Sequence, residues 1–251
     1  MHHFYLPPDR CHDSSMTLTD REAHHGLHVL RLRRGEPLTV LDGAGHEYLC
    51  ETAELGRTTI HLTVRRKQDV PPMPYQLTLA QAIPRGKVFD SIVQKATELG
   101  VHRIVPLLSE RVISQLDEES SQSKADHWRT MAVEAIKQCG SAWLPRIEPP
   151  TAFKTFLALG ETFDLSLMAT LLPASRHPRA WFKAFYEEHQ QMPRSVCLWI
   201  GPEGDFTPAE IMAAQSVSAR PISLGRLVLR SETAAIYGLS VLNYELQAAA
   251  L

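Results

Sequence analysis

The sequence lacks features that mark several classes of protein. Its four cysteines form no CxxC pair, which argues against a disulfide framework and against a cysteine-based zinc site. No apolar run approaches the roughly 18 residues that span a bilayer, and the first residues contain no apolar signal-peptide core. A net charge of −2 provides no overall basic field of the kind that attracts nucleic acid. These absences favour a protein of the reducing cytoplasm.

The chain contains two regions of different pattern. Apolar residues make up 44% of it and charged residues 22%, which is enough for a sizeable core. Residues 1–68 are typical of an all-β region, in which residues 42–45 (DGAG) separate two alternating apolar segments, as in a β-hairpin. Residues 69–74 (DVPPMP) contain three prolines and predict a stiff linker. We therefore expect one domain over residues 1–70 and another over residues 74–251.

Strand and helix patterns alternate after the linker. Residues 75–83 and 103–108 predict strands, and an apolar face recurs at helical spacing over residues 87–99. This alternation is typical of a mostly parallel sheet with helices on its faces. The polar residues 118–124 predict a mobile loop. The expected fold is α/β, preceded by a smaller β domain.

One pattern occurs twice near the C-terminal end: an apolar strand, a glycine turn and the start of a helix. The strand 195–200 precedes Gly-Pro-Glu-Gly at 201–204, and the Thr-Pro-x-Glu of residues 207–210 follows as a helix N-terminus. A second strand at 222–224 and a turn at 225–230 lead into the last helix. Two glycine turns at neighbouring strand ends can hold one ligand against their backbone. Ordinary strand–helix connections have the same spacing, so the pattern alone leaves both interpretations open.

The motifs GPEG and LG-(x)4-R-x-ET resemble those of the RsmE family of 16S ribosomal RNA uridine-N3 methyltransferases. QKATELGV at 94–101 and SER at 109–111 are also similar, so the resemblance covers nearly the whole chain. It implies a SPOUT-type, trefoil-knotted α/β methyltransferase domain preceded by a small PUA-like β-barrel, with S-adenosyl-L-methionine as cofactor. The cofactor-binding residues that it implies are Met168, Ala169, Leu171, Ile200, Gly201, Pro202, Glu203, Gly204, Leu224, Gly225 and Leu229.

Two charged residues after the second glycine turn, Arg230 and Glu232, are candidates for the chemistry. Uracil N3 is weakly acidic and must lose its proton before or during methylation. A cation beside the uracil oxygens stabilises the negative charge that develops, and Arg230 keeps its charge at all relevant pH values. Glu232 is a candidate to accept the proton or to orient Arg230. The alternative for both is a structural ion pair at the start of the last helix.

Basic residues of the first region form local patches. We expect RNA contacts through His25, Arg31, Arg33, Arg34, Arg65, Arg66 and Lys67. Such runs are more often a solvated charged surface, but the resemblance to a PUA-like RNA-binding barrel favours RNA. The histidines of this region lack acidic or cysteine companions at zinc-site spacing, so no metal is expected.

The chain departs from the family pattern at four places. Lys137-Gln138-Cys139-Gly140-Ser141 stands where the family usually has Glu-Gln-(Cys/Ser)-Gly-Arg, Asp205 stands where a second glycine is frequent, and Leu227 and His3 stand where arginine is common. These differences concern RNA contacts and the shape of the cofactor loops.

Two functions from different classes follow. The first is methylation of one uridine of 16S rRNA within the assembled 30S subunit, because two patches on a rigid barrel fit a preformed surface better than a flexible strand. The second is a non-catalytic RNA-binding or ribosome-assembly factor on the same scaffold. A Rossmann-type enzyme is disfavoured because no GxGxxG opens a helix. Apolar residues on several sides of the last helix, together with the resemblance, predict a homodimer.

Overall fold

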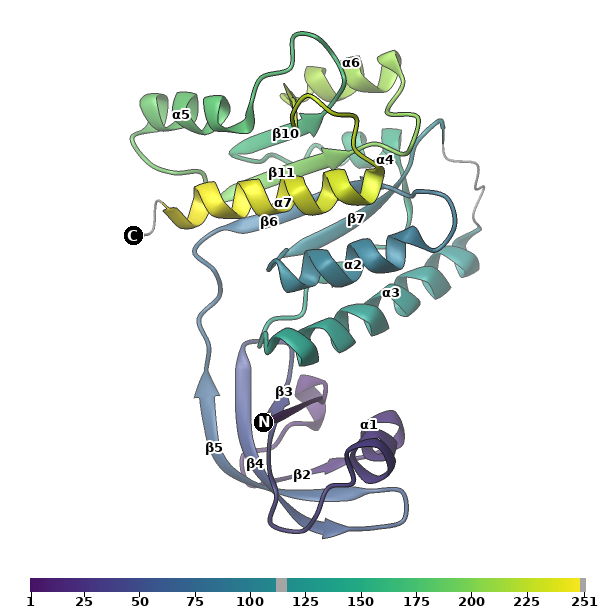
Figure 1. The fold of residues 1–251 in the computed structure, drawn as a ribbon, viewed down its shortest axis with the longest axis vertical. Helices are drawn as coiled ribbons and strands as arrows, with labels where there is room; N and C mark the ends of the chain where they lie inside the picture. Colours follow the sequence, from purple (N-terminus) through teal and green to yellow (C-terminus); the bar gives the residue numbers. More distant parts are fainter. Residues whose placement is uncertain (112–116, 249–251) are drawn as a thin grey trace. The chain divides into compact units, whose positions relative to one another are not determined.

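The computed structural model describes residues 1–111 and 117–248. It divides into two compact units, each built around its own sheet (Figure 1). The first unit comprises Met1–Pro72 and Val133–Leu144, and the second comprises Met73–Ala132 and Pro145–Leu251. The chain first passes from one unit to the other within the proline-rich residues 69–74.

The first unit contains a five-stranded sheet in the order β1-β3-β4-β5-β2. Its elements are β1 (His2–Tyr5), η1 (Pro8–Arg10), β2 (Ser15–Leu18), α1 (Asp20–His24), η2 (His25–Leu30), β3 (Pro37–Leu41), β4 (His46–Leu55) and β5 (Ile60–Asp69). β3 and β4 are antiparallel, which confirms the hairpin predicted at residues 42–45. Alternate residues of β4 point inward, so Tyr48, Cys50 and Thr52 are buried, and the first two join the core of this unit.

The second unit contains a seven-stranded sheet whose strands are all paired in parallel. The order is β12-β10-β11-β6-β7-β8, and β9 also pairs with β7. The strands are β6 (Gln76–Ala82), β7 (Arg103–Leu108), β8 (Arg146–Ile147), β9 (Thr151–Ala152), β10 (Leu165–Ala169), β11 (Ser195–Ile200) and β12 (Arg220–Ile222). The predicted parallel α/β architecture is confirmed. β12 ends at Ile222, earlier than predicted, because the amide of Ser223 already bonds to the carbonyl of Arg176 outside the ladder.

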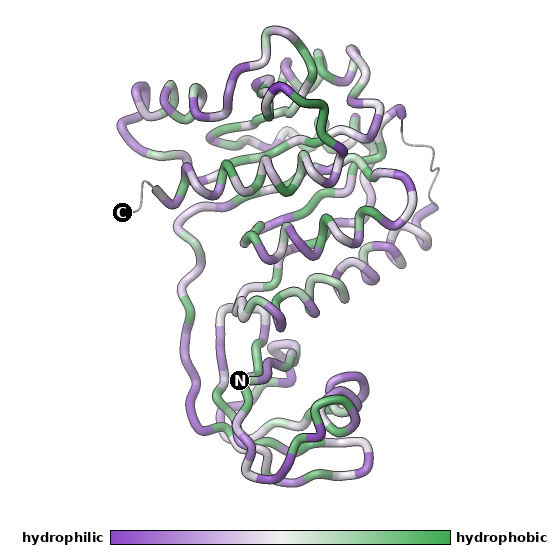
Figure 2. The backbone as a smooth tube through the Cα atoms, viewed as in Figure 1, coloured by the Kyte–Doolittle hydropathy of each residue, from purple (hydrophilic) through white to green (hydrophobic). Residues whose placement is uncertain are grey.

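Helices cover both faces of this sheet (Figure 1). They are α2 (Val88–Glu98), α4 (Phe153–Ala158), α5 (Pro178–His189), α6 (Pro208–Ser216) and α7 (Ser231–Ala248). A further helix, α3 (Glu118–Cys139), begins in the second unit and ends in the first. α2 and α7 pack against each other, and α7 contacts β6 and β11. Hydrophobic and hydrophilic residues alternate along α2 and α7 (Figure 2). The apolar residues of α2 are buried on one face, whereas α7 also has the exposed aromatic residues Tyr237 and Tyr244. Within the described residues, none of the helices combines the length and apolar character needed to cross a bilayer.

The start of α3 corrects one prediction. Residues 118–124, predicted as a mobile loop, form the first turns of this helix. The Asp117 carboxylate accepts a hydrogen bond from the amide of Ser120 (2.8 Å), as a helix cap does. These turns are almost wholly exposed up to the buried Ala125, so they need no apolar residues and show no helical periodicity.

The start of α6 confirms another prediction. The Thr207 hydroxyl accepts a hydrogen bond from the amide of Glu210, and the Glu210 carboxylate accepts one from the amide of Thr207. With Pro208 in the first turn, this is a complete capping box. It fixes where the chain turns back towards the sheet after the Gly-Pro-Glu-Gly turn.

Candidate active site

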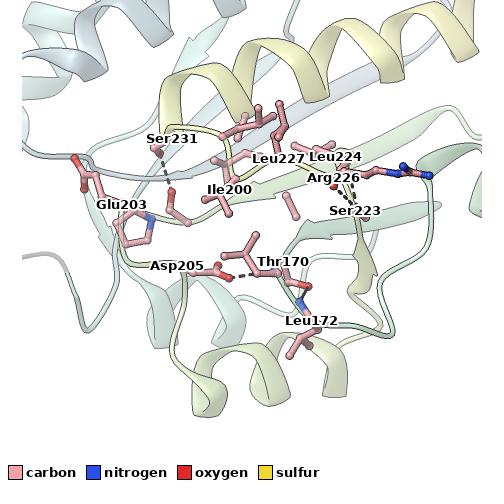
Figure 3. Close-up of a pocket in the computed structure, with 18 residues that line it drawn as sticks. Thr170, Leu172, Ile200, Glu203, Asp205, Ser223, Leu224, Arg226, Leu227 and Ser231 are labelled. Atoms are coloured by element: carbon pink, nitrogen blue, oxygen red, sulfur yellow. Dashed lines mark hydrogen bonds between the residues drawn. The ribbon is translucent and has the colours of Figure 1, made fainter.

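Three loops meet at the carboxyl edge of the parallel sheet, after β10, β11 and β12 (Figure 3). These strands are neighbours, so their ends open at one edge of the sheet. Together the loops enclose a pocket of about 250 Å³. Its lining consists of Ala169, Thr170, Leu171 and Leu172, of Ile200, Gly201, Pro202, Glu203 and Asp205, of Ser223, Leu224, Gly225, Arg226, Leu227, Val228 and Leu229, and of Ser231 and Ala234 in α7.

Most residues predicted to bind the cofactor lie around this one pocket. Those that line it are Ala169, Leu171, Ile200, Gly201, Pro202, Glu203, Leu224, Gly225 and Leu229. Met168 does not, because it is packed into the core with Phe153 and Trp199. Gly204 also lies outside the lining, beside the side chain of Arg111. The sequence placed both next to the correct loops but did not show which way each residue faces.

The two glycine turns have different reasons for glycine. A Cβ at Gly201 would lie 3.0 Å from the Asp205 carboxylate and 3.1 Å from the amide nitrogen of Phe206, because the turn folds back on itself. Gly225 has a φ of +121°, a conformation that residues with side chains rarely adopt. Apart from its two chain neighbours, none of the described residues has an atom within 4 Å of a Cβ built there. The first turn needs glycine for space and the second for its backbone conformation.

A buried hydrogen-bond chain connects the turns to the sheet. Gln81, at the end of β6 and fully buried, donates from Nε2 to the Ser231 hydroxyl (2.9 Å). That hydroxyl donates to the carbonyl oxygen of Gly201 (2.7 Å). The chain holds the first turn of α7 against the Gly201 turn, so both walls of the pocket depend on it. Our sequence analysis missed Gln81, although a lone amide in the strand LTLAQA was a usable signal.

Further contacts fix the 201–205 loop. The Glu203 carboxylate accepts a hydrogen bond from the amide of Arg85 (2.9 Å), and the Arg111 guanidinium donates to the carbonyl oxygen of Gly204. Asp205 has a φ of +62°, and its carboxylate accepts a bond from the amide of Leu171 (3.4 Å). The residue that replaces the family's glycine therefore connects the first and second loops of the pocket.

The two candidate chemical residues flank Ser231, which lines the pocket. Arg230 is exposed and Glu232 is half-buried in the first turn of α7. Neither side chain lines the pocket itself. In the part of the chain that the structure describes, no ion pair joins Arg230 to Glu232, so the alternative of a structural ion pair gains no support.

The predicted RNA-contacting residues of the first unit fall into two groups. Four arginines are exposed and, among the described residues, form no ion pair; they are Arg31, Arg33, Arg34 and Arg66. The other two cations are already paired: Arg65 Nη2 lies 3.0 Å from Glu51, and Lys67 Nζ lies 3.5 Å from Asp13. His25 is half-buried with its ring edge-on to Phe4. Of the predicted RNA-contacting cations, these four arginines are therefore the ones whose charge is not paired within the described residues.

Two departures from the family pattern meet in the first unit. The Lys137 side chain is only 8% exposed, and its ammonium lies 2.7 Å from Glu22 and 3.2 Å from Glu134. The His3 ring nitrogen Nδ1 donates to the carbonyl oxygen of Lys137 (2.8 Å), and the same ring lies beneath Gly140. His3 and Lys137 thus belong to one connected set of contacts, in which carboxylates of the same unit neutralise the lysine charge.

Comparisons with known proteins give a consistent result. A model of an RNA methyltransferase domain matches residues 71–243, and a model of an RNA methyltransferase PUA domain matches residues 18–65. A Synechocystis protein named ribosomal RNA small subunit methyltransferase E is 32% identical, over 95% of this chain and 76% of its own length.

Two solved structures are similar over nearly the whole chain. A methyltransferase from Legionella pneumophila, solved in complex with the cofactor SAM, is 31% identical with a TM-score of 0.85, over 98% of this chain and 97% of its own. A ribosomal RNA small subunit methyltransferase E from Neisseria gonorrhoeae, bound to S-adenosyl methionine, is 25% identical with a TM-score of 0.83, over 97% of each chain.

Proposed function

Because the chain belongs to the ribosomal RNA small subunit methyltransferase E family, we propose that it methylates N3 of one uridine of 16S rRNA. Its fold is a PUA-like domain followed by a SPOUT-type α/β methyltransferase domain, with domain limits that we propose at 1–70 and 74–251. The proposed methyl donor is S-adenosyl-L-methionine, and the proposed location is the cytoplasm. The observation that carries the proposal is the pocket formed by the three loops at the carboxyl edge of the sheet.

The pocket has the properties that this cofactor requires. Leu171, Ile200, Leu224 and Leu229 offer apolar surface for a planar adenine ring, while the absence of a side chain at Gly201 and Gly225 lets a ligand approach the backbone there. When bound, the cofactor supplies a methyl group that is activated by its positively charged sulfur. The protein therefore has to align the uracil and manage its proton.

We assign the chemistry of the base to Arg230 and Glu232. The N3–carbon bond forms as the methyl–sulfur bond breaks, and the N3 proton passes to Glu232 and then to solvent. The guanidinium of Arg230 stabilises the negative charge on the uracil oxygens while N3 attacks. Support comes from their position on either side of the pocket-lining Ser231 and from the absence of a mutual ion pair in the described chain.

The proposed substrate is the assembled 30S subunit. The four predicted arginines that form no ion pair within the described residues are few contacts for a flexible strand, whose ordering opposes binding. On a preformed surface the RNA is already ordered, so this entropic cost of binding is absent. The target base then leaves its stack to reach the pocket. The test is methyl transfer to unmodified 30S subunits, to protein-free 16S RNA and to a short oligonucleotide. We expect the highest kcat/KM on 30S; equal values on all three would contradict this substrate.

We propose that the second unit forms a homodimer. Four large apolar side chains are exposed on the third loop and on α7: Leu227 (79%), Val228 (77%), Tyr237 (45%) and Tyr244 (72%). A second copy of the chain is the proposed partner for this surface, beside the pocket. Light scattering should give twice the mass of one chain at micromolar concentration, and a monomer would contradict the proposal.

The trefoil knot that the family resemblance implies is also a proposal. It is supported by the start of α7, which is bonded through Ser231 both to the Gly201 turn and to Gln81 of β6. Mechanical extension between Met73 and Gln247 should stop short of the roughly 3.5 Å per residue of a fully extended chain. Full extension would contradict a knot.

A non-catalytic RNA-binding factor remains the second candidate. It would bind 30S subunits through the first unit while the pocket stayed without a role. Cofactor titration together with a methyl-transfer assay separates the two, because a factor of this kind would bind ribosomal particles without turnover.

A further inference from the structure

Two arginines and a tryptophan form a cluster at the β12 edge of the second unit. The guanidinium carbon of Arg176 lies 5.3 Å from the centre of the Trp181 ring, and that of Arg220 lies 5.4 Å from it. Both arginines are exposed and Trp181 is half-buried. We call these three residues the arginine–tryptophan cluster. It is distinct from the basic patches of the first unit.

Backbone contacts hold the cluster in place. The indole nitrogen of Trp181 donates to the carbonyl oxygen of Pro221 (3.3 Å). The amide of Arg176 donates to the same carbonyl (3.3 Å), and its own carbonyl accepts a bond from the amide of Ser223 (2.9 Å). Arg220 is the first residue of β12, which is the edge strand of the sheet. The two charges therefore project from a fixed support instead of from a free loop.

The charge of the cluster is not neutralised. Within the described residues, neither Arg176 nor Arg220 forms an ion pair, whereas Arg103, Arg129 and Arg146 of the same unit each pair with a carboxylate. Two guanidinium groups held against one ring repel each other, and a bound anion removes that repulsion. Stacking on an aromatic ring also orients the planar guanidinium and leaves its N–H groups available.

The cluster is continuous with the pocket. Ser223, which bonds to Arg176, lines the pocket together with Arg226. Figure 3 shows the Arg226 side chain extending outward from the pocket on the side of Ser223. A polyanion lying on the cluster would thus pass directly beside the third loop.

We propose that Arg176 and Arg220, oriented by Trp181, bind phosphate groups of the RNA strand that carries the target uridine. This inference rests on the proposed function and adds a second RNA-contacting surface, on the catalytic unit itself. Guanidinium groups form paired hydrogen bonds with phosphate oxygens, which fixes the register of a strand without reading its sequence. The first unit would hold the subunit, and this cluster would hold the strand next to the pocket.

The test uses the double variant Arg176→Ala/Arg220→Ala and the matched control Arg194→Ala. Arg194 is also exposed, forms no ion pair within the described residues, and directly precedes β11, outside the arginine–tryptophan cluster. For each protein, the affinity for 30S subunits is measured as a function of salt, together with the affinity for S-adenosylmethionine and the melting temperature. Binding rather than turnover is the main readout, so the result does not depend on the chemistry assigned to the pocket.

Each phosphate contact contributes roughly 0.7 to the slope of log affinity against log salt, which corresponds to about fivefold in affinity near 0.1 M salt. The double variant should therefore lose about 1.4 from the slope and roughly 25-fold in affinity, with cofactor binding unchanged. Arg194→Ala should match the wild type. Arg176→Lys/Arg220→Lys should keep most of the slope but lose affinity, because lysine retains the charge without the paired geometry.

A double variant with the wild-type slope would overturn the inference, whether or not its melting temperature falls. Removal of a cluster with a purely structural role would lower stability but leave the salt dependence of binding unchanged. If the double variant does not fold, the same comparison is made with Arg220→Ala. This single variant should lose about 0.7 from the slope and about fivefold in affinity. Wild-type protein that binds 30S in this salt-dependent way but transfers no methyl group would refute the proposed function and leave the cluster standing.

Discussion

Two places in the second unit differ in how their arginines are paired: the amino end of β7 and the loops around the pocket at the carboxyl end of the sheet. At the amino end of β7, Arg103 is only 16% exposed and is paired with Glu148 and Glu161. At the carboxyl end, Arg226 and Arg230 are exposed and, among the described residues, unpaired. Charges that are neutralised within the fold contribute to stability, while unneutralised charges beside a pocket are available to a ligand. The comparison assigns stability to the charge cluster of Arg103 at the amino end of β7 and chemistry to the arginines beside the pocket.

The pKa values agree with this division. Hydrogen bonding to Glu161 raises the pKa of Arg103, although its partial burial acts in the other direction. The same hydrogen bond lowers the pKa of Glu161 below its ordinary value. Both shifts favour the charged forms, so this pair is a folded-state interaction and not a poised acid or base.

The largest effect is expected at the carboxyl end. Arg230→Ala should lower kcat on 30S subunits by a factor of about 100 or more, the scale of losing one group that stabilises developing charge. Single-turnover methyl transfer measures the rate, and calorimetry measures cofactor binding. Arg230→Lys serves as the control and should retain part of the rate. Weaker cofactor binding with unchanged turnover would make Arg230 a binding residue instead.

The next effect tests the amino end. Arg103→Met keeps most of the side-chain volume but leaves Glu148 and Glu161 without their cation. The free energy of unfolding should fall by about 2 kcal/mol, between the values for exposed and buried pairs. Urea unfolding measures the change, and kcat should not change. A variant that is as stable as the wild type but slow would reverse the assignment of the two ends.

The pH dependence of this pair has a definite sign. The folded-state pKa of Glu161 is lowered, so its stabilisation is fully present above the unfolded value of about 4.3 and is lost as the pH falls through the folded value. The stability difference between wild type and Arg103→Met should therefore shrink below about pH 4. A difference that stays constant down to acid pH would show that Glu161 is not the partner that matters.

A smaller effect is expected from the glycine turn. Gly201→Ala places a methyl group 3.0 Å from the Asp205 carboxylate and 3.1 Å from the Phe206 amide, so the turn has to shift. Overpacking of this kind costs roughly 1–3 kcal/mol, which predicts an increase in the Kd of the cofactor of about tenfold. Calorimetric titration measures it. Unchanged affinity would show that the cofactor does not depend on this turn.

The smallest effect is expected from Asp205→Gly. Glycine removes the strain of a side chain at a φ of +62°, worth about 1 kcal/mol, and also removes the long bond to the Leu171 amide. These changes oppose each other, so cofactor affinity should stay within about threefold of the wild type. A larger loss would show that the carboxylate contacts the ligand directly.

Local sequence signals predicted much of the fold. The hairpin at residues 42–45 and the cap of α6 at Thr207 depend on residues a few positions apart, so the sequence displays them directly. The start of α3 was mispredicted because its helical turns are solvent-exposed and carry no apolar period. The positions of the glycine turns followed from their strands, and the pocket then followed from the parallel order of those strands.

The contacts that fix the site could not be predicted from the sequence, because they join residues far apart in the chain. Gln81 and Ser231 are 150 residues apart, and the ammonium of Lys137 donates a hydrogen bond to Glu22, which is 115 residues away in the chain. Only the folded chain shows that Lys67 already has an acidic partner in Asp13, whereas Arg230 lacks one among the described residues. Composition gives the number of charges, but the fold decides which of them remain available.

The most direct test of the central claim is the identity of the methylated nucleoside. Unmodified 30S subunits would be incubated with the protein and S-adenosylmethionine that carries a deuterated methyl group, and the 16S rRNA would be digested and analysed by mass spectrometry. The account predicts one 3-methyluridine per subunit, with the label in its methyl group, and an initial rate lower by a factor of about 100 or more with Arg230→Ala. Label on a carbon atom or on a ribose oxygen, or no label at all, would contradict it.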